Sequence, residues 1–177
     1  MRNRGALYAG ILVVALGLIM LFAQATQGMH VLGLNLGWRL AWPFLILLAG
    51  LAFLLPIGIW WERRASLAGL AVPGVIITVN GLILLFQNMT GLWGTWSYLW
   101  ALEPIAVALG LLALYFLTNR DQGVLVASGI VGGVGVLGFL LSSGAFRILG
   151  PLVLILAGVL LAAGALTRRD DRAPNTP

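Results

Sequence analysis

The sequence predicts an all-α integral membrane protein whose six transmembrane helices form three helical hairpins. The first reason is composition: 61% of the 177 residues are hydrophobic and only 8% are charged. Soluble domains carry about 25% charged residues, and a chain of this size cannot hide so much apolar surface from water. The second reason is a series of long apolar runs, and the third is an internal repeat.

Six apolar runs are long enough to cross a bilayer as helices. A hydrocarbon core about 30 Å thick needs roughly 20 helical residues. None of the runs alternates polar and apolar residues, as strands of a transmembrane barrel would. The runs are 6–23, 40–59, 67–86, 98–117, 123–141 and 148–166. Short connections make 1–166 a single transmembrane domain, and 167–177 is predicted to be a disordered polar cytoplasmic tail.

Arginine placement predicts the orientation, because cytoplasmic loops are enriched in basic residues. All ten basic residues are arginine, and Arg39 and Arg147 lie on one side of the predicted membrane. The other eight lie on the side of both termini: Arg2, Arg4, Arg63, Arg64, Arg120, Arg168, Arg169 and Arg172. We therefore expect a multi-pass protein of a bacterial cytoplasmic membrane with both termini in the cytoplasm. These arginines flank apolar runs rather than forming a basic face, so nucleic acid is not an expected partner.

A second interpretation of the N-terminal segment stays open. Arg2 and Arg4, an apolar run and the small residues around Ala25 also resemble a signal peptide. The apolar run is longer than most cleaved signals carry, and the internal repeat claims the same residues as a structural helix. We expect the helix to be retained.

The repeat unit is a helical hairpin that occurs as 6–59, 67–118 and 123–166. Residues 10–22 align without gaps on 74–86, and both glycines of each segment coincide. Residues 38–50 align on 146–158 with the arginine, the proline and the Ala-Gly pair in register. The middle copy is less regular. Coinciding Gly, Pro and Arg indicate a repeat better than leucine matches do in so apolar a chain.

Small residues on helix faces are the predicted packing positions. Glycines seven residues apart share a helix face, and small faces let membrane helices approach closely. The predicted packing glycines are Gly10, Gly17, Gly74, Gly81, Gly129 and Gly133. The pattern G-x-G-x-x-G at 133–138 lies inside an apolar run and lacks the preceding strand that a dinucleotide site requires, so it too is assigned to packing.

Glu103 is the only carboxylate within a predicted span. Such a residue is costly in lipid unless it is paired or hydrated, so it is a candidate proton or cation site. The alternative is a shallow carboxylate near the outer interface that pairs with arginine. If the hairpins pack around a pseudo-threefold axis, Arg39 and Arg147 stand at matching positions and Glu103 lies about one turn deeper. A partly buried cluster of these three residues is then expected.

Thr78 and Asn80 are polar residues within the third run, where hydrogen bonds between helices are the usual role and a substrate contact is the alternative. The chain has no cysteine, and His30 has no nearby carboxylate, so no metal site is expected. No serine, histidine and acid set can be assembled, so no catalytic residue and no cofactor are expected. Asn88 and Thr90 form a glycosylation sequon by pattern alone.

One segment resembles the transmembrane region of the LiaI/LiaF-like bacterial envelope proteins. Trp38, Trp42-Pro43 and the aliphatic run that ends at Gly50 carry the likeness, and Trp96 to Pro104 is a looser copy. It covers mainly residues 6–118. The resemblance implies a small accessory membrane protein, tied in some members to envelope-stress signalling.

Together these features predict a non-enzymatic accessory or scaffold protein. Few polar groups line the spans, whereas the small-residue faces suit contact with another membrane protein or with a second copy. The expected surroundings are the lipid bilayer. The alternative is a small transporter or channel that uses Glu103 and Asn80, because repeated hairpins also build transporters.

Overall fold

A computed structural model of the chain describes residues 3–31, 34–35, 37–144, 151–152, 154–162 and 164. The chain divides into two compact units, Met1–Phe139 and Leu140–Pro177. The helices described next belong to the first unit, except for the last turn of the final one. Within the second unit, residues 151–152, 154–162 and 164 are helical.

Long helices dominate the first unit, with short helical turns between them. The long helices are α1 (Arg4–Ala25), α2 (Trp38–Ile59), α4 (Ala71–Thr90), α6 (Leu102–Leu117) and α7 (Gln122–Ser142). The short elements are β1 (His30–Val31), β2 (Leu34–Asn35), η1 (Trp61–Arg63), α3 (Arg64–Leu67), η2 (Ala68–Leu70), η3 (Trp93–Thr95) and α5 (Trp96–Leu99). The connection between the first two long helices was predicted to be a loop, and it contains the antiparallel pair β1–β2, in which His30 is opposite Asn35.

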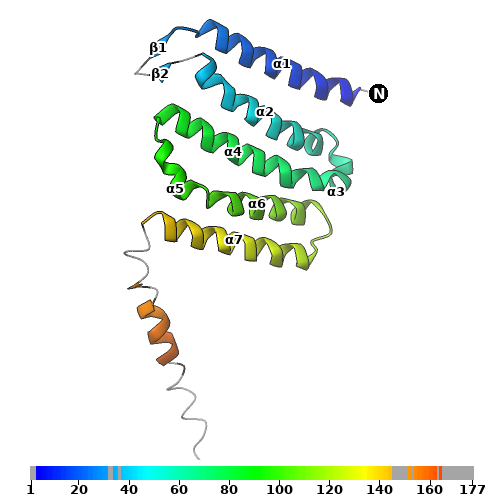
Figure 1. The fold of residues 1–177 in the computed structure, drawn as a ribbon. Coiled ribbons are helices and arrows are strands. Elements are labelled where there is room, and N and C mark those ends of the chain that lie inside the picture. Colours follow the sequence, from blue (N-terminus) through cyan, green and yellow to red (C-terminus); the bar gives the residue numbers. More distant parts are fainter. Residues whose placement is uncertain are drawn as a thin grey trace, which may run out of the picture. The chain divides into compact units, whose positions relative to one another are not determined.

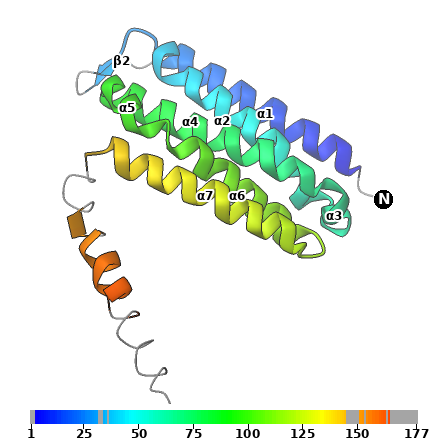
Figure 2. The same cartoon turned by 60° about the horizontal axis from the view of Figure 1, so that its bottom comes forward.

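The long helices of the first unit lie side by side in chain order (Figures 1 and 2). α2 packs between α1 and α4, and α4 packs between α2 and α6. α7 follows along the other side of α6. Short connections place each helix antiparallel to the one before it. The result is a row of helices, and α4 lies at its centre.

Four helical segments of the described chain are long and apolar enough to cross a membrane: Arg4–Ala25, Leu40–Ile59, Trp61–Thr90 and Gln122–Ser142. A fifth segment qualifies if Trp93–Leu99 and Leu102–Leu117 are taken together, although they are bent by 57° relative to one another. These segments confirm the prediction of a helical chain with several membrane-length apolar runs. Of the nineteen residues of the run predicted at 148–166, the twelve that the structure describes (151–152, 154–162 and 164) are helical.

The run predicted at 98–117 is interrupted near its start. α5 ends at Leu99, α6 begins at Leu102, and the bend lies between them. The apolar content of the run did not reveal the break, because it does not depend on whether the helix is continuous. The helical segment that follows α4 is therefore broken.

The α2–α4 interface depends on glycines. A Cβ atom added to Gly50 of α2 would stand 2.8 Å from the backbone nitrogen of Thr78 in α4. In the reverse direction, Leu54 fills the space that a Cβ on Gly74 would take, and Leu47 fills that of Gly81. The backbones thus approach closely, and the resulting dispersion contacts hold helices together where lipid is as apolar as leucine.

Smaller contacts of the same kind join the next helices in the row. A Cβ on Gly110 of α6 would stand 2.8 Å from the Cα atom of Val72 in α4. A Cβ on Gly135 of α7 would stand 2.9 Å from the backbone nitrogen of Ile105 in α6. Close by, the Ser128 hydroxyl donates to the carbonyl oxygen of Ala108 at 2.8 Å. Small residues therefore set the spacing along the row.

The six glycines predicted to pack fall into two groups. Gly74 and Gly81 lie in the α2–α4 interface. The other four face open space, because no described atom lies within 4 Å of where a Cβ would stand; they are Gly10, Gly17, Gly129 and Gly133. Those glycines lie on α1 and α7, the first and last helices of the row. Their small faces are thus unoccupied within the described chain.

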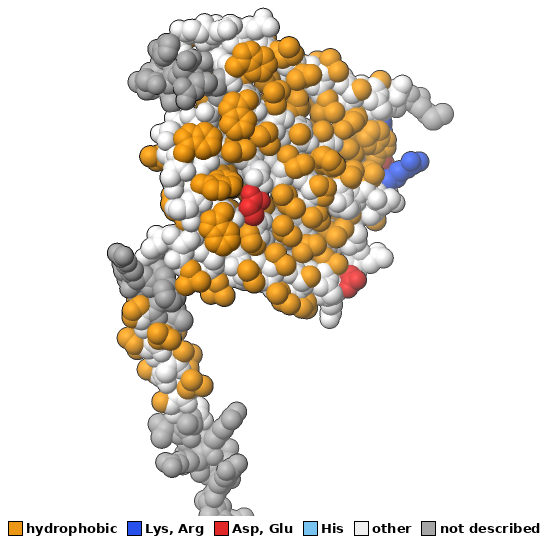
Figure 3. All heavy atoms as spheres, in the orientation of Figure 1, with side chains coloured by type: hydrophobic (Ala, Val, Ile, Leu, Met, Phe, Trp, Pro, Cys, Tyr) orange, Lys and Arg blue, Asp and Glu red, His pale blue; other side chains and the backbone are white. Residues whose placement is uncertain are grey.

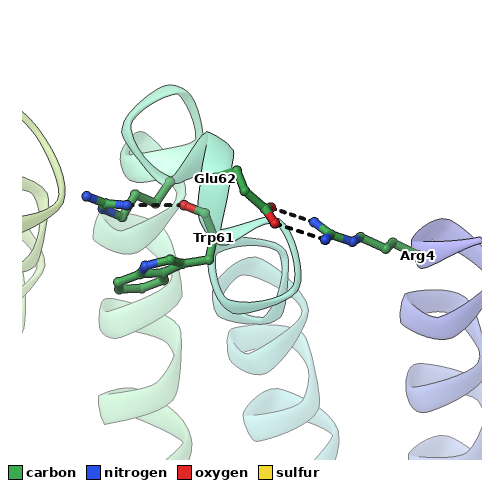
Figure 4. Close-up of polar contacts among 4 residues, drawn as sticks. Arg4, Trp61 and Glu62 are labelled. Carbon is green, nitrogen blue, oxygen red and sulfur yellow. Dashed lines mark hydrogen bonds and ion pairs between the residues drawn. The ribbon is translucent and has the colours of Figure 1, made fainter. Parts of the chain in front are cut away.

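Polar contacts attach α1 to the rest of the row. The Tyr8 hydroxyl donates to the carbonyl oxygen of Ala52 in α2 at 2.9 Å. At the end of the helix, the Arg4 guanidinium forms two hydrogen bonds with the Glu62 carboxylate, of 2.5 and 2.9 Å (Figure 4). The rings of Phe22 and Phe44 meet edge to face near the other end. α1 therefore belongs to the folded unit along its whole length.

The α2–α4 interface gives a first prediction. Gly50→Ala should lower the free energy of unfolding by about 1–3 kcal/mol, the usual cost of overpacking, because the added methyl meets α4 backbone. Gly58→Ala in the same helix is the matched control, since nothing lies within 4 Å of its Cβ position. Denaturant titration in detergent micelles measures both changes. Equal stability of the two variants would contradict the close approach of α2 and α4.

Candidate intramembrane polar site

Three polar side chains of α4 are divided between two faces of this helix. Thr78 faces α2, beside Gly50, and its hydroxyl donates to the carbonyl oxygen of Gly74 in its own helix at 2.7 Å. Asn80 and Gln87 share another face, because seven residues are almost two turns. Their hydrogen bonds reach α6 and η3. Thr78 therefore contributes to packing, whereas Asn80 and Gln87 bind the broken helix.

Asn80 forms the central contact of the site. Its side-chain nitrogen donates to the carbonyl oxygen of Ile76 at 3.0 Å and to Oε2 of Glu103 at 2.9 Å. Both side chains are half-buried. The hydrogen bond to Ile76 fixes the orientation of the Asn80 amide, and the amide donates to Glu103 in that orientation. The structure thus brings together the two residues singled out in the sequence as a possible transport site.

This hydrogen bond places the Glu103 carboxylate deep in the helix row. Asn80 lies ten residues before the end of α4 at Thr90, which is about 15 Å along the helix axis. Asn80 and the Glu103 side chain that it contacts therefore lie near the middle of α4 rather than at its end.

The start of α6 provides a suitable place for a carboxylate. Glu103 lies in the first turn of this helix, and its backbone nitrogen donates to the carbonyl oxygen of Trp100 at 3.1 Å. The partial positive charge at a helix N-terminus stabilises negative side chains there. Pro104 follows in the same turn, where its missing amide hydrogen costs little.

Gln87 is a second polar residue of this region, and the sequence did not predict it as a site residue. Its side chain is fully buried, and its nitrogen donates to the Thr95 hydroxyl at 3.3 Å. Thr95 in turn donates to the carbonyl oxygen of Leu92 at 2.7 Å. The third run was predicted to end at residue 86, one residue before Gln87. Its spacing of seven residues from Asn80 was the available signal.

Several oxygen atoms of the site have no hydrogen-bond donor. The buried Oε1 of Gln87 is one of them. No described group donates to Oε1 of Glu103 or to Oδ1 of Asn80 either. Figure 3 shows acidic side chains as isolated spots on a face that is mostly hydrophobic. The site thus presents free acceptors in apolar surroundings.

The expected cluster of Glu103 with two arginines falls outside the described side chains. Arg147 and the side chain of Arg39 are not among the described parts of the chain. The Arg39 backbone lies in the first turn of α2, about 16 Å along the axis from Gly50, which packs beside Thr78. α4 also lies between α2 and α6 (Figure 1). Asn80 is the partner that the structure gives to Glu103.

A separate polar group lies where α2 turns into η1. Besides the Arg4–Glu62 ion pair, the Arg64 guanidinium lies 5.0 Å from the ring centre of Trp61, and Trp61 is exposed (Figure 4). Tryptophan with arginine is typical of a membrane–water boundary. Across the described part of the chain, no three His, Asp or Glu side chains gather as a metal site. These residues are suited to anchoring rather than chemistry.

No family model, no curated protein and no solved structure matches this chain.

A double-mutant cycle tests the central hydrogen bond. Asn80→Ala and Glu103→Ala should each destabilise the protein, and their effects should be non-additive by about 0.5–1.5 kcal/mol, the order of hydrogen bonds between membrane helices. Stability is measured by denaturant titration in micelles. Thr78→Ala is the control, because its hydroxyl bonds only within α4 and should show no coupling to Glu103. Additive effects of the Asn80 and Glu103 changes would show that the two side chains do not interact.

Proposed function

We propose that this chain is a non-enzymatic, multi-pass membrane protein that acts as an accessory or scaffold subunit by binding other membrane proteins. The observation that carries the proposal is the row of helices in the first unit. A single row covers few of its own side chains, and large hydrophobic residues are exposed along α1 and α7. Lipid can cover such faces, but faces that also carry small residues suit helix association.

The free face of α1 is the best candidate for such contact. Gly10 and Gly17 are open, and a shallow apolar groove on this helix is lined by Gly10, Val14 and Leu18 among others. A second shallow groove lies between α1 and α2, beside Phe22 and Phe44. Within the row, closed glycine faces hold α2 against α4. The open face of α1 offers the same kind of surface to a separate helix.

The finer topology belongs to the same proposal. We place six spans in three hairpin repeats, with both termini on the cytoplasmic side of a bacterial cytoplasmic membrane. Arginine distribution supports this orientation. The likeness of 38–50 to the LiaI/LiaF-like transmembrane region supports an envelope-associated accessory role.

Association in native membranes tests the scaffold function. Crosslinking followed by mild-detergent purification should recover the chain with another membrane protein or with a second copy. Gly10→Leu combined with Gly17→Leu should reduce this recovery, because leucine holds a neighbouring backbone away. The matched pair Gly10→Ala and Gly17→Ala should largely retain it. The chain's own fold tolerates both pairs, since no described atom lies within 4 Å of either Cβ position. Recovery of a lone monomer in every case would contradict the proposal.

A small transporter or channel is the second candidate, and one observation favours it. Transporters bind ions near the membrane midplane where helices are broken and half-helix ends meet the ligand. Here a carboxylate in the first turn of α6 follows a bend of 57° and contacts an amide of α4. That arrangement suits a proton or a small cation.

Reconstituted vesicles test the second candidate. If Glu103 carries the transported ion, Glu103→Gln should abolish a pH-dependent flux, because the amide cannot supply the charge. Glu62→Gln is the control, since Glu62 lies at the end of the row in an exposed ion pair. Flux is measured with proton, sodium and potassium gradients. If vesicles that contain the wild-type chain show no more flux than protein-free vesicles under all three gradients, transport of these ions is excluded.

A further inference from the structure

The Glu103 carboxylate is only half satisfied within the described chain. One oxygen accepts the Asn80 amide at 2.9 Å, and the other accepts no hydrogen bond from a described group. Asn80 is a neutral donor, and the start of α6 adds only a partial positive charge. The carboxylate lies about 15 Å along α4 from Thr90, where charged groups are costly unless they pair. The carboxylate therefore lacks a cationic partner among the described side chains that contact it.

The described arginines of the chain lie too far away to serve. Arg64 precedes Asn80 by sixteen residues and lies at the opposite end of α4, roughly 24 Å away along a helical path. Arg120 follows the far end of α6, about 25 Å from Glu103 along that helix. Arg63 precedes Arg64 and lies farther still from Asn80. Arg4, at the start of α1, pairs with Glu62 of η1. A direct ion pair needs about 4 Å, so none of these four reaches the carboxylate.

The side chains around Glu103 on α4 and α6 are mostly apolar, which suits contact with another helix better than contact with water. Ile76 and Leu84 lie one turn to either side of Asn80 on α4, and Val107 lies one turn after Glu103 on α6. All three are partly exposed and apolar. Trp100, beside the bend, is exposed as well. An apolar strip with one anionic acceptor at its centre is complementary to an apolar helix with one cationic donor.

We propose that this α4–α6 face binds a transmembrane helix of another protein, and that an arginine or lysine at the middle of that helix pairs with Glu103. A second copy of the chain fits less well, because the same face would bring two carboxylates together. The described arginines of a second copy also lie near helix ends rather than at this depth. The inference rests on the proposed scaffold function and names the chemistry of one partner.

Synthetic helices test this pairing with the full chain in phosphatidylcholine nanodiscs. The probe is a fluorescent leucine-rich peptide of about 22 residues with one central lysine. Its matched controls carry leucine at the centre, or the lysine moved two turns toward one end. Energy transfer from a donor on the chain reports binding. The central-lysine peptide should bind wild-type chain at least about tenfold more tightly than either control, a difference within reach of hydrogen-bonded pairs between membrane helices.

Variants of the chain assign the effect to Glu103. Glu103→Gln should remove the preference for central lysine, whereas Glu62→Gln should keep it. Circular dichroism checks that each variant retains its helices. Should Glu103→Gln not fold, Glu103→Asp replaces it, and the shorter carboxylate should weaken the preference without removing it.

Three results would overturn the proposal. The first is equal binding of the lysine and leucine peptides, and the second is a lysine preference that persists in Glu103→Gln. The third is self-association of the wild-type chain that depends on Glu103 and that the lysine peptide does not displace, which would make a second copy the occupant. If the peptides fail while the chain still recovers membrane proteins through α1, this pairing is wrong and the scaffold function stands.

Discussion

The close approach of α2 and α4 is the contact on which the rest of the helix row depends. Gly50 lets the α2 backbone meet Thr78, while Leu54 and Leu47 of α2 occupy the space above Gly74 and Gly81. Because apolar side chains gain little by leaving lipid for protein, helix association in a membrane relies on such tight packing. α4 is thereby fixed as the central helix, and its remaining face becomes available to the broken helix that follows.

The two faces of α4 have different chemistry, and this difference organises the site. Its glycine face is held against α2, and the face with Asn80 and Gln87 binds the segments on either side of the bend. Asn80 contacts the first turn of α6, and Gln87 contacts Thr95 in η3. A bend in an apolar helix leaves its end exposed unless side chains hold it in place. Polar groups of α4 therefore stabilise a break that the apolar sequence would not maintain by itself.

A row of helices has consequences for function. Each inner helix is covered by two neighbours, but the broad faces and the outer helices remain available to lipid or to partners. On α1 the available surface is apolar and contains the small residues Gly10 and Gly17. Between α4 and α6 it is apolar and contains one anionic acceptor, Glu103. These are two kinds of surface, one suited to backbone packing and one to charge pairing. Both are the surfaces on which the proposed association rests.

The sequence by itself determined the helical, membrane-length character of the chain, because apolar runs of about 20 residues have few other folded states open to them. It also singled out Glu103 and Asn80 as unusual, because polar groups are rare in such runs. It did not determine the bend after Leu99, since the hydropathy of a run is the same whether its helix is continuous or broken. It did not separate glycines that pack, such as Gly81, from those that face outward, such as Gly10. Only the tertiary structure decided these points, because contact depends on which helix lies beside which face, and a repeat of small residues carries no such information.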